Sequence, residues 1–433
     1  MSNAERDESA GTTARAYGEA LLSQFGFSGV IEGVADHPAL AWRRSGLMAV
    51  TGAADATGRI CPAALASAAD GALLAMKALV PNPARLPASG ALLLGERARL
   101  LGLARRGRVS ANGSCRLLDT IDGRIALNLA RDDDRPLAAL LAGRETGSWA
   151  DVEQGVAGQS TDELLALGVE LGLPIARDRP PAPTERLFEP VAAARPHRHE
   201  APLVLDLSSL WAGPLAASLL RMAGAEVVKV ESRARPDGAR FGHRGFYDLL
   251  NAGKHAVMLD FSARADLARL QALIDRADVV IEGSRPRALR RLGIDRDTAV
   301  ARGTIWLSLT AHPEEDRVGF GDDAAIEAGV ATLMERACGE ASFVGDAIAD
   351  PLTGLHAALA GWAAWRAGEG RLIRLSLSGS VAHAMRAGIA EGEALSAWQA
   401  LAEADEAPLY PLRRPADAAR EPGADTETVM ARC

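Results

Sequence analysis

Acidic side chains gather at the start of a predicted helix near residue 320. The stretch GFGDDAAIEAG, residues 319–329, places Asp322 and Asp323 side by side and Glu327 about one helical turn later. An ionised carboxylate can act as a nucleophile or as a general base. Acidic residues are also common in the first turn of a helix, where they stabilise the exposed N–H groups. From the residues alone, this structural role is the simpler interpretation.

Two further features bear on chemistry at this place. Asp322 and Asp323 carry like charges, and their proximity raises the pKa of one carboxyl group and weakens it as a nucleophile. Another aspartate, Asp350, stands in the stretch IADPLTG. A reaction that moves a proton between two faces of a substrate needs a base on each face.

The elements that position these residues follow a regular alternation after residue 202. Helical segments such as PLAASLLRMAG and ADLARLQALIDRA separate short apolar runs, which favours a doubly wound, mostly parallel, Rossmann-like α/β sheet. Ligands of such sheets bind beyond the carboxyl ends of the strands. We expect the strands at 203–208, 226–231, 256–261, 278–283, 304–310 and 372–378.

The first of these units resembles the start of a nucleotide-binding domain. Residues 202–232, PLVLDLSSLWAGPLAASLLRMAGAEVVKVES, read as strand, small-residue turn, amphipathic helix and strand. The turn contains neither GxGxxG nor GxxxxGK[ST], which are the patterns for dinucleotides and for nucleoside triphosphates. These residues alone therefore leave the ligand of the turn open.

Composition shifts divide the chain into five expected parts. A proline-rich, charged linker at 179–201 has no periodicity. Before it we expect an N-terminal extension (1–36) and a smaller, second α+β domain (37–178). After it we expect the Rossmann-like domain (202–386) and a C-terminal tail that returns to it (387–433).

Two local patterns add detail to this division. Asp122-Gly123, between two apolar runs, predicts a β-hairpin in the smaller domain. Residues 60–79 and 343–362 share small residues, a polar residue before Gly71 or Gly354, and an apolar helical face. This similarity is faint, because alanine-rich helices resemble one another easily.

Bulk composition excludes several classes of protein. The net charge of -8 argues against nucleic acid and anionic membrane surfaces as partners. No apolar run approaches the length of a membrane span, and the polar, acidic N-terminus is unlike a signal peptide. The four cysteines (Cys61, Cys115, Cys338 and Cys433) are scattered, which predicts no metal site, no disulfide framework and a cytoplasmic location.

Several consecutive stretches carry a family resemblance. LDLSSLWAGPLAASLLRMAGAEVVKVE, FYDLLNAGKHAVMLDF and ADVVIEGSRPRALRRLGID resemble, in order and spacing, the large domain of the family III CoA-transferases, relatives of α-methylacyl-CoA racemase. The resemblance covers about residues 202–385. The segments at 42–52 and 114–133 are also similar to this family, but to parts that follow the large-domain start there. The order is therefore rearranged in this chain.

The resemblance implies a chemistry and a nucleophile. Family members use an aspartate that attacks an acyl-CoA thioester and passes CoA to a second carboxylic acid through covalent intermediates. Matching DDAAIEAGVATLM to the family's nucleophile-bearing helix places Asp323 at that position. The partners implied are an acyl-CoA, a carboxylic acid and a second copy of the chain, in an interlocked homodimer.

The resemblance also implies that coenzyme A occupies the turn after the first strand. Its phosphates favour arginine, lysine and helix N-terminal amides. Lysine is rare here, with only Lys77, Lys229 and Lys254, so a retained lysine can mark a place that needs a compact ammonium group. The expected coenzyme-binding residues are Ser209, Trp211, Ala212, Arg233, Lys254, Arg285 and Arg291.

Two alternatives stay open at this point. Racemase-like proton transfer has Asp350 as one base, but Asp322 stands where those relatives carry a histidine. A non-catalytic, CoA-binding or partner subunit is favoured by the rearranged order and by the weak match to the family's glycine-rich loop. Trp211 departs from the polar residue of formyl-CoA-type members, so formate and oxalate are not implied.

Overall fold

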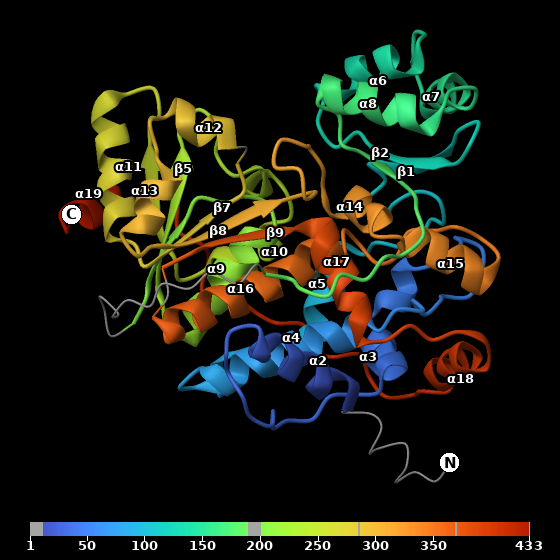
Figure 1. Cartoon of the computed structure of the whole chain (residues 1–433), viewed down its shortest axis with the longest axis horizontal. Helices are drawn as coiled ribbons and strands as arrows, with labels where there is room; N and C mark the ends of the chain where they lie inside the picture. Colours follow the sequence, from blue (N-terminus) through green and yellow to red (C-terminus); the bar gives the residue numbers. More distant parts are fainter. Residues whose placement is uncertain (1–11, 189–200, 285, 369, 433) are drawn as a thin grey trace.

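Two β-sheets of different size organise the computed structural model, which describes residues 12–188, 201–284, 286–368 and 370–432 (Figure 1). The larger sheet has the order β6-β5-β4-β7-β8-β9, and all its pairs are parallel. In chain order this is 3-2-1-4-5-6, the Rossmann arrangement. The expected fold class is thus confirmed. The strands are β4 (Leu203–Asp206), β5 (Glu226–Ser232), β6 (His255–Leu259), β7 (Val279–Glu282), β8 (Ile305–Thr310) and β9 (Leu372–Ser376).

Helices cover both faces of this sheet, as parallel strands require. One face packs against α9 and α16, and the other against α11, α12 and α13. Residues alternate along the strands, so Val204 joins the first core and Leu205 the second. The helices after β4 are α9 (Ala212–Ala223), α10 (Arg244–Asn251), α11 (Arg264–Arg276), α12 (Pro286–Arg291), α13 (Arg296–Ala301), α14 (Gly321–Glu327), α15 (Val330–Cys338), α16 (Ala349–Ala367) and α17 (Leu377–Ala384).

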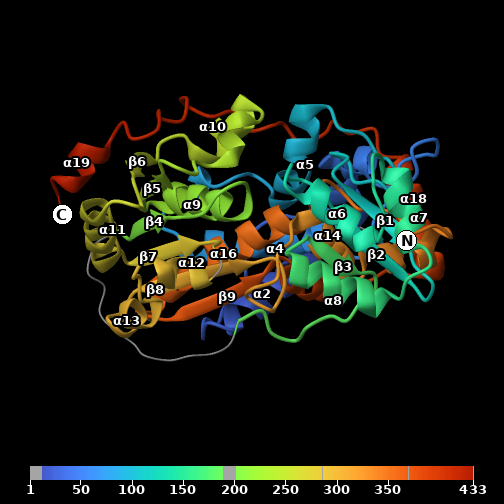
Figure 2. The same cartoon turned by 90° about the horizontal axis from the view of Figure 1, so that it is seen from above.

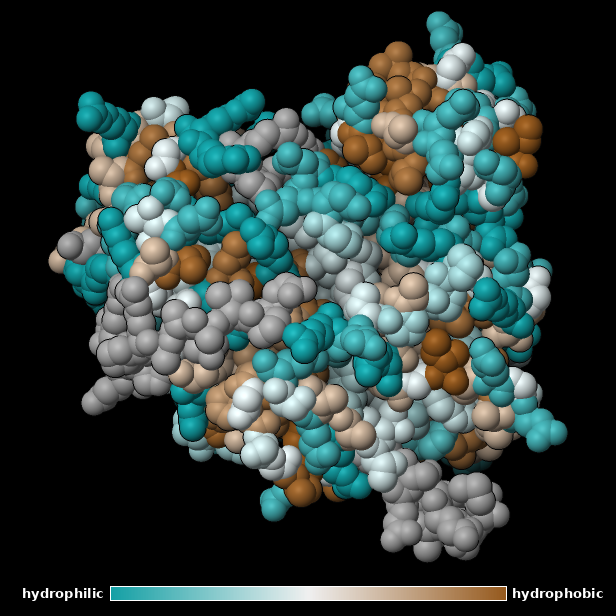
Figure 3. Space-filling model, viewed as in Figure 1, coloured by the Kyte–Doolittle hydropathy of each residue, from teal (hydrophilic) through white to brown (hydrophobic). Residues whose placement is uncertain are grey.

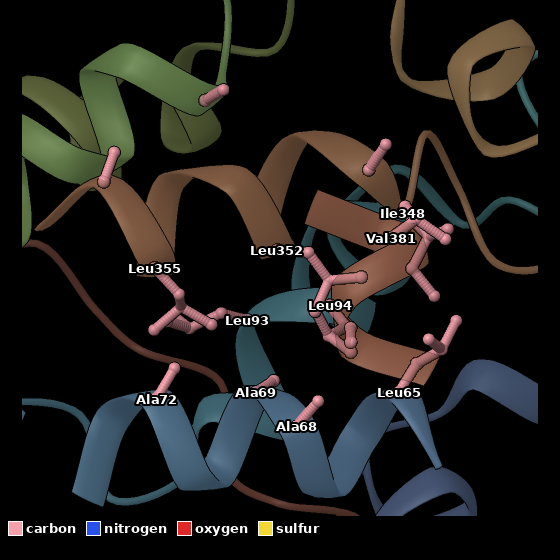
Figure 4. Close-up of a cluster of buried hydrophobic side chains, with 14 of the residues drawn as sticks. Leu65, Ala68, Ala69, Ala72, Leu93, Leu94, Ile348, Leu352, Leu355 and Val381 are labelled. Carbon is pink, nitrogen blue, oxygen red and sulfur yellow. The ribbon is translucent and has the colours of Figure 1, made fainter. Parts of the chain in front are cut away.

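Helices from the first quarter of the chain belong to the same core. The side chains of α4 pack against those of α5, α16 and α17 (Figure 4). This differs from the expected boundaries, which separated these helices from the Rossmann-like part. The buried apolar face of α4 continues the face of α16, so neither could be buried alone. These helices are α2 (Thr12–Ser23), α3 (Pro38–Arg44), α4 (Leu65–Leu79) and α5 (Gly90–Leu101).

The faint sequence repeat coincides with a repeated way of packing helices. A Cβ atom at Gly71 of α4 would lie 2.3 Å from the carbonyl oxygen of Ala14 in α2. A Cβ at Gly354 of α16 would lie 2.7 Å from the carbonyl oxygen of Ala212 in α9. Each glycine therefore lets another helix cross at close range, which explains why both segments keep glycine there.

Residues 115–177 form a smaller unit with its own core. The hairpin predicted at Asp122-Gly123 is confirmed, and a third antiparallel strand completes the sheet. Apolar surface remains visible on this unit (Figure 3), where Leu140 and Val169 are exposed. Its elements are β1 (Cys115–Asp119), β2 (Arg124–Asn128), α6 (Asp134–Ala142), α7 (Trp149–Val156), α8 (Thr161–Leu171) and β3 (Ile175–Arg177).

The C-terminal segment runs back along the molecule. After α18 (Gly392–Glu403) the chain passes α5 and α10 and ends in α19 (Thr426–Met430), beside β6 (Figure 2). Arg413 pairs with the buried Glu96 at 2.5 Å, and the backbone N–H of Ala256 donates to Asp425 at 2.8 Å. These contacts tie the tail to both the first helices and the edge of the large sheet.

The described ranges contain neither a membrane-spanning helix nor a cluster of metal-ligating side chains. No helix there is long and apolar enough to cross a membrane. The same residues contain no group of three or more histidine, cysteine, aspartate or glutamate side chains placed to hold a metal ion.

A buried polar chain joins the N-terminal helix to the large core. His356 Nδ1 lies 2.7 Å from the carbonyl oxygen of Leu352 and must donate to it, so its Nε2 accepts from the Tyr17 hydroxyl at 2.8 Å. Tyr17 in turn accepts from His383 Nδ1 at 2.7 Å, and Gln24 donates to His383 Nε2 at 3.3 Å. Burial lowers the pKa of His356 to about 4 and that of His383 to about 3, so both rings are neutral at pH 7.

Replacing Tyr17→Phe should lower the free energy of unfolding by about 2 kcal/mol at pH 7.5, because both imidazoles then lose a buried hydrogen bond. Urea unfolding measures this loss. Tyr247→Phe is the matched control: Tyr247 is also buried, but its hydroxyl has no hydrogen-bond partner among the described residues. Its change should stay within about 0.5 kcal/mol. Equal losses of stability in the two variants would contradict the hydrogen bonds assigned to Tyr17.

Candidate active site

A cavity of about 200 Å³ lies at the carboxyl edge of the large sheet. Its walls come from the residues that follow β4, β7, β8 and β9, and from Asp350 at the start of α16. The strand order reverses between β4 and β7, and ligands of doubly wound sheets bind at this switch point. In Figure 3 an indentation separates the sheet from the small unit.

A larger crevice elsewhere is a weaker candidate. It measures about 1180 Å³ and lies between α15 and α18, where Arg336, Cys338 and Glu403 are among its lining residues. Both helices lie away from the sheet (Figure 1). Because the smaller cavity occupies the switch point, we place the candidate site there.

Buried charges shape the turn that opens the site. Asp206 ends β4 and accepts from the Ser208 backbone and hydroxyl, while Lys254 Nζ donates to Asp206 at 2.8 Å. Lys229 Nζ donates to the Ser208 carbonyl oxygen at 2.9 Å. Burial alone would raise the pKa of Asp206, but the two lysines hold it at about 2. A Cβ at Gly213 would lie 2.1 Å from Ser208 Oγ, so only glycine fits there.

This network engages Lys254, which was expected to bind the coenzyme, with partners inside the protein. Its ammonium donates to Asp206, to the Pro214 carbonyl oxygen at 2.9 Å and to Asn251 Oδ1 at 3.0 Å. An ammonium group has three donors, and all are used inside the protein. Lys254 is 2% exposed, so no donor remains for a phosphate. The rarity of lysine did mark a special place, but its role is structural.

Asp323 does not line the cavity. It is fully buried, and its Oδ1 accepts from the Phe320 backbone N–H at 3.0 Å and from Asn128 Nδ2 at 3.1 Å. His312 Nε2 lies 3.6 Å from its Oδ2. The carboxylate therefore caps its own helix, the simpler of the two interpretations of this stretch. Gly319 stands on the cavity side, since a Cβ there would lie 2.5 Å from Asp323 Oδ2.

Asp350 is the aspartate that lines the cavity, and it is partly exposed. Burial raises its pKa to about 7, with smaller contributions from Asp346 and Asp323; Arg97 and the backbone N–H of Ala212 oppose this rise. A Cβ at Gly321 would lie 2.1 Å from Asp350 Oδ2, so this neighbour must also be glycine.

Backbone strain concentrates around the same cavity. Among the described residues, Leu210 (φ 69°) and Ala347 (φ 43°) are the non-glycine residues with positive φ. Leu210 lines the cavity, and the carbonyl oxygen of Ala347 would lie 2.6 Å from a Cβ at Gly321. Positive φ is unfavourable for side-chain-bearing residues and is often retained at functional sites.

One cation faces several buried carboxylates behind Asp350. Arg97 Nη1 lies 3.5 Å from Asp346 Oδ1, and its guanidinium stacks 5.0 Å from the centre of the Trp211 ring. Burial and Asp346 raise the pKa of Asp322 to about 7, which Arg97 opposes. Asp322 accepts from the Ala347 backbone N–H at 2.9 Å and does not line the cavity. It is therefore poorly placed as the second base of a racemase.

The other expected coenzyme-binding residues fall into three groups. Ser209 is exposed and lines the cavity with Ala212. Trp211 is 4% exposed and packs edge-on against Phe246, so it belongs to the wall behind the site. Arg233 and Arg291 are exposed but do not line the cavity, and Arg285 lies outside the described residues.

Sequence reasoning missed the residues that other parts of the chain supply. Arg97 comes from α5. Asn112, which precedes the small unit, donates to Asp322 at 3.2 Å, and Asn128 of the small unit donates to Asp323 at 3.1 Å. No local pattern marks these residues. Arg317 was within reach of sequence reasoning, because it stands in the loop AHPEEDRVGFG just before α14.

Comparison with known proteins agrees with the sequence-based resemblance. Residues 202–406 match the profile of CoA-transferase family III. A succinate–glutarate CoA-transferase of Agrobacterium fabrum is 28% identical over 40% of this chain and 49% of its own length. A probable fatty acyl-CoA transferase of Mycobacterium tuberculosis is 33% identical over 35% of this chain and 42% of its own.

A solved structure shows the same partial coverage. A CAIB/BAIF family protein from Brucella suis aligns with a TM-score of 0.38 and 26% identity, over 42% of this chain and 53% of its own. The chain thus spans about half the length of the relatives it matches. The match to CoA-transferase family III covers residues 202–406, the part of the chain that holds the switch-point cavity and Asp350.

Proposed function

We propose that the protein transfers coenzyme A from an acyl-CoA thioester to a free carboxylic acid, with Asp350 as the covalent nucleophile. The observation that carries this proposal is the position of Asp350, whose carboxylate lines the switch-point cavity of a family III segment. Asp350 takes the role that was expected of Asp323, because the oxygens of Asp323 are engaged in capping α14.

The reaction proceeds by exchange between carboxylates. An oxygen of Asp350 attacks the thioester carbonyl carbon, the C–S bond breaks, and a mixed anhydride and a CoA thiolate form. The thiolate then attacks the aspartyl carbonyl carbon and releases the donor acid, which leaves an enzyme thioester. The acceptor carboxylate reverses both steps and leaves with CoA. No bond energy from ATP is required, since each activated acyl group is formed at the expense of another.

The surroundings of Asp350 suit these steps. The N-terminus of α9 begins at Ala212 beside it, and its backbone N–H groups favour negative charge there. Shielding from water would protect an anhydride from hydrolysis, and the cavity is small, about 200 Å³. Within the proposal, Ser209 and Ala212 line the path of the coenzyme, and the exposed Arg233 and Arg291 are available to its phosphates.

Assembly and location complete the proposal. The family resemblance supports a homodimer. Cys61 and Cys115 are buried free thiols, which agrees with a reducing, cytoplasmic setting.

Replacing Asp350→Asn should abolish transfer, with a loss of at least about 10⁴-fold in kcat, because no covalent intermediate can form. The variant should still bind CoA. Hydroxylamine trapping after mixing with an acyl-CoA, followed by mass spectrometry, should place a hydroxamate on Asp350 of the unsubstituted protein.

Asp323→Asn is the control for this experiment. It should retain most of the activity and lose about 1 kcal/mol of stability, because it weakens a helix cap. Loss of transfer in Asp323→Asn, with turnover kept in Asp350→Asn, would restore the original assignment. Exchange of the α-proton in deuterated water without transfer would favour a racemase. CoA binding without either reaction would favour a non-catalytic partner subunit.

The pH profile should report the ionisation of Asp350. The pKa of Asp350 is raised to about 7, so the carboxyl is protonated and unreactive below that pH. We therefore expect kcat/KM for the acyl-CoA to rise about tenfold per pH unit up to pH 7 and then to level off. Arg97→Gln should move this midpoint upward, because Arg97 favours the charged form, and Arg97→Lys should move it less. A midpoint near pH 4 would count against Asp350.

A further inference from the structure

The loop between β8 and α14 brings one cation to the cavity wall. Arg317 lines the cavity, and its side chain is 11% exposed. Its Nη2 donates to the Ile175 carbonyl oxygen of the small unit at 3.1 Å and to Glu327 Oε2 at 3.0 Å, and its Nη1 donates to Glu314 Oε2 at 3.3 Å. The guanidinium is thus held in a fixed orientation by three separate elements.

These bonds use three of the five N–H groups of the guanidinium, and the Nε–H is one of the two that remain. Arg317 Nε is buried and has no hydrogen-bond partner among the described residues. Buried N–H donors are normally satisfied, so this exception beside a cavity needs an explanation, which a bound ligand would supply. A guanidinium is especially suited to bind a carboxylate.

The charge of the cavity also calls for a cation. Its acidic lining residues are Asp350 and Glu315, and Arg317 is the single basic residue in the described lining. The charge of Glu315 is balanced by Arg374 at 2.5 Å and Arg296 at 3.6 Å. A carboxylic acid that approaches ionised Asp350 would be repelled, because like charges in a poorly solvated site interact strongly. Arg317 opposes that repulsion, although it shares its charge with Glu327 and Glu314.

We infer that Arg317 determines specificity by binding the non-reacting carboxylate of a short dicarboxylic acid. This inference rests on the proposed function. A guanidinium bonded to the reacting carboxylate would withdraw electron density from the attacking oxygen, whereas the remote carboxylate keeps its charge through every step. The cavity of about 200 Å³ is smaller than the 300–1,000 Å³ typical of drug-sized ligands, which favours a short chain.

A comparison of two acids with equal carbon number tests this inference. The probes are succinate and butyrate as acceptors, and succinyl-CoA and butyryl-CoA as donors, with the enzyme thioester followed by mass spectrometry. The unsubstituted protein should favour the four-carbon diacid. Arg317→Gln should lower kcat/KM for the succinyl probes by about 10- to 100-fold through KM, because the lost contact is equal in ground and transition states. The butyryl probes should change by less than about twofold.

Glu327→Gln is the matched control. It removes the charged partner of Arg317 but keeps the guanidinium, so the preference for succinate should survive. If Arg317→Gln fails to fold, Arg317→Lys should retain part of the preference, since an ammonium keeps the charge without the fork geometry.

The outcomes separate the inference from the proposed function. A covalent intermediate with equal use of both acids would overturn only the role of Arg317. An equal loss with both acids in Arg317→Gln, repeated in Glu327→Gln, would show that Arg317 merely holds the loop and would also overturn the inference. Absence of any enzyme thioester from the unsubstituted protein would overturn the proposed function itself.

Discussion

Asp206 and its two lysines fix the turn on which the rest of the site depends. Lys229 and Lys254 are each 2% exposed, and both approach the same carboxylate at the end of β4. Removing one partner of such a buried set leaves an uncompensated charge, which is strongly unfavourable. The turn can therefore not relax, and Leu210 is held at a positive φ with its N–H bonded to Asp237 at 2.9 Å. Residues of this turn, Ser208 to Leu210, form one wall of the cavity.

The repeated crossing of helices fixes the other wall. Gly354 allows α16 to approach α9, and this close approach brings Asp350 to the N-terminus of α9. The same helix packs on α4 through alanine and leucine side chains (Figure 4). The first quarter of the chain therefore packs behind α16, which carries the proposed nucleophile, and supplies Arg97. The N-terminal helices and the large sheet therefore share one core and do not form two separate halves.

The large sheet could be predicted from the sequence because each of its strands is marked by residues that are adjacent in the sequence. Each β-branched run is bounded by turn residues, and the alternation with helices permits few topologies. The hairpin at Asp122-Gly123 was equally local. The place of α4 in the main core could not be derived, because an alanine-rich helix packs equally well against many partners. The roles of Lys254 and Arg97 depend on partners far away in the sequence, and no local pattern indicates those contacts.

Asp323 and Asp350 show the same limit within the candidate site. Both stand in the first turn of a helix, so their local patterns are similar. What separates them is which oxygen atoms are already engaged: those of Asp323 bind the Phe320 backbone and Asn128, which lies in another unit. The Phe320 contact is local, but the Asn128 contact forms only when the small unit packs against α14.

Charge crowding gives the proposed chemistry a physical rationale. Asp322, Asp346 and Asp350 share one nearby cation, Arg97, and burial raises the pKa of all three. When Asp350 forms an anhydride or a thioester, it loses its negative charge and the repulsion from its neighbours is relieved. The crowding that raises the energy of the free carboxylate thus favours the covalent states over it. An isolated, well-solvated aspartate would gain nothing from acylation, which explains why a buried acidic cluster is compatible with, and useful to, a carboxylate nucleophile.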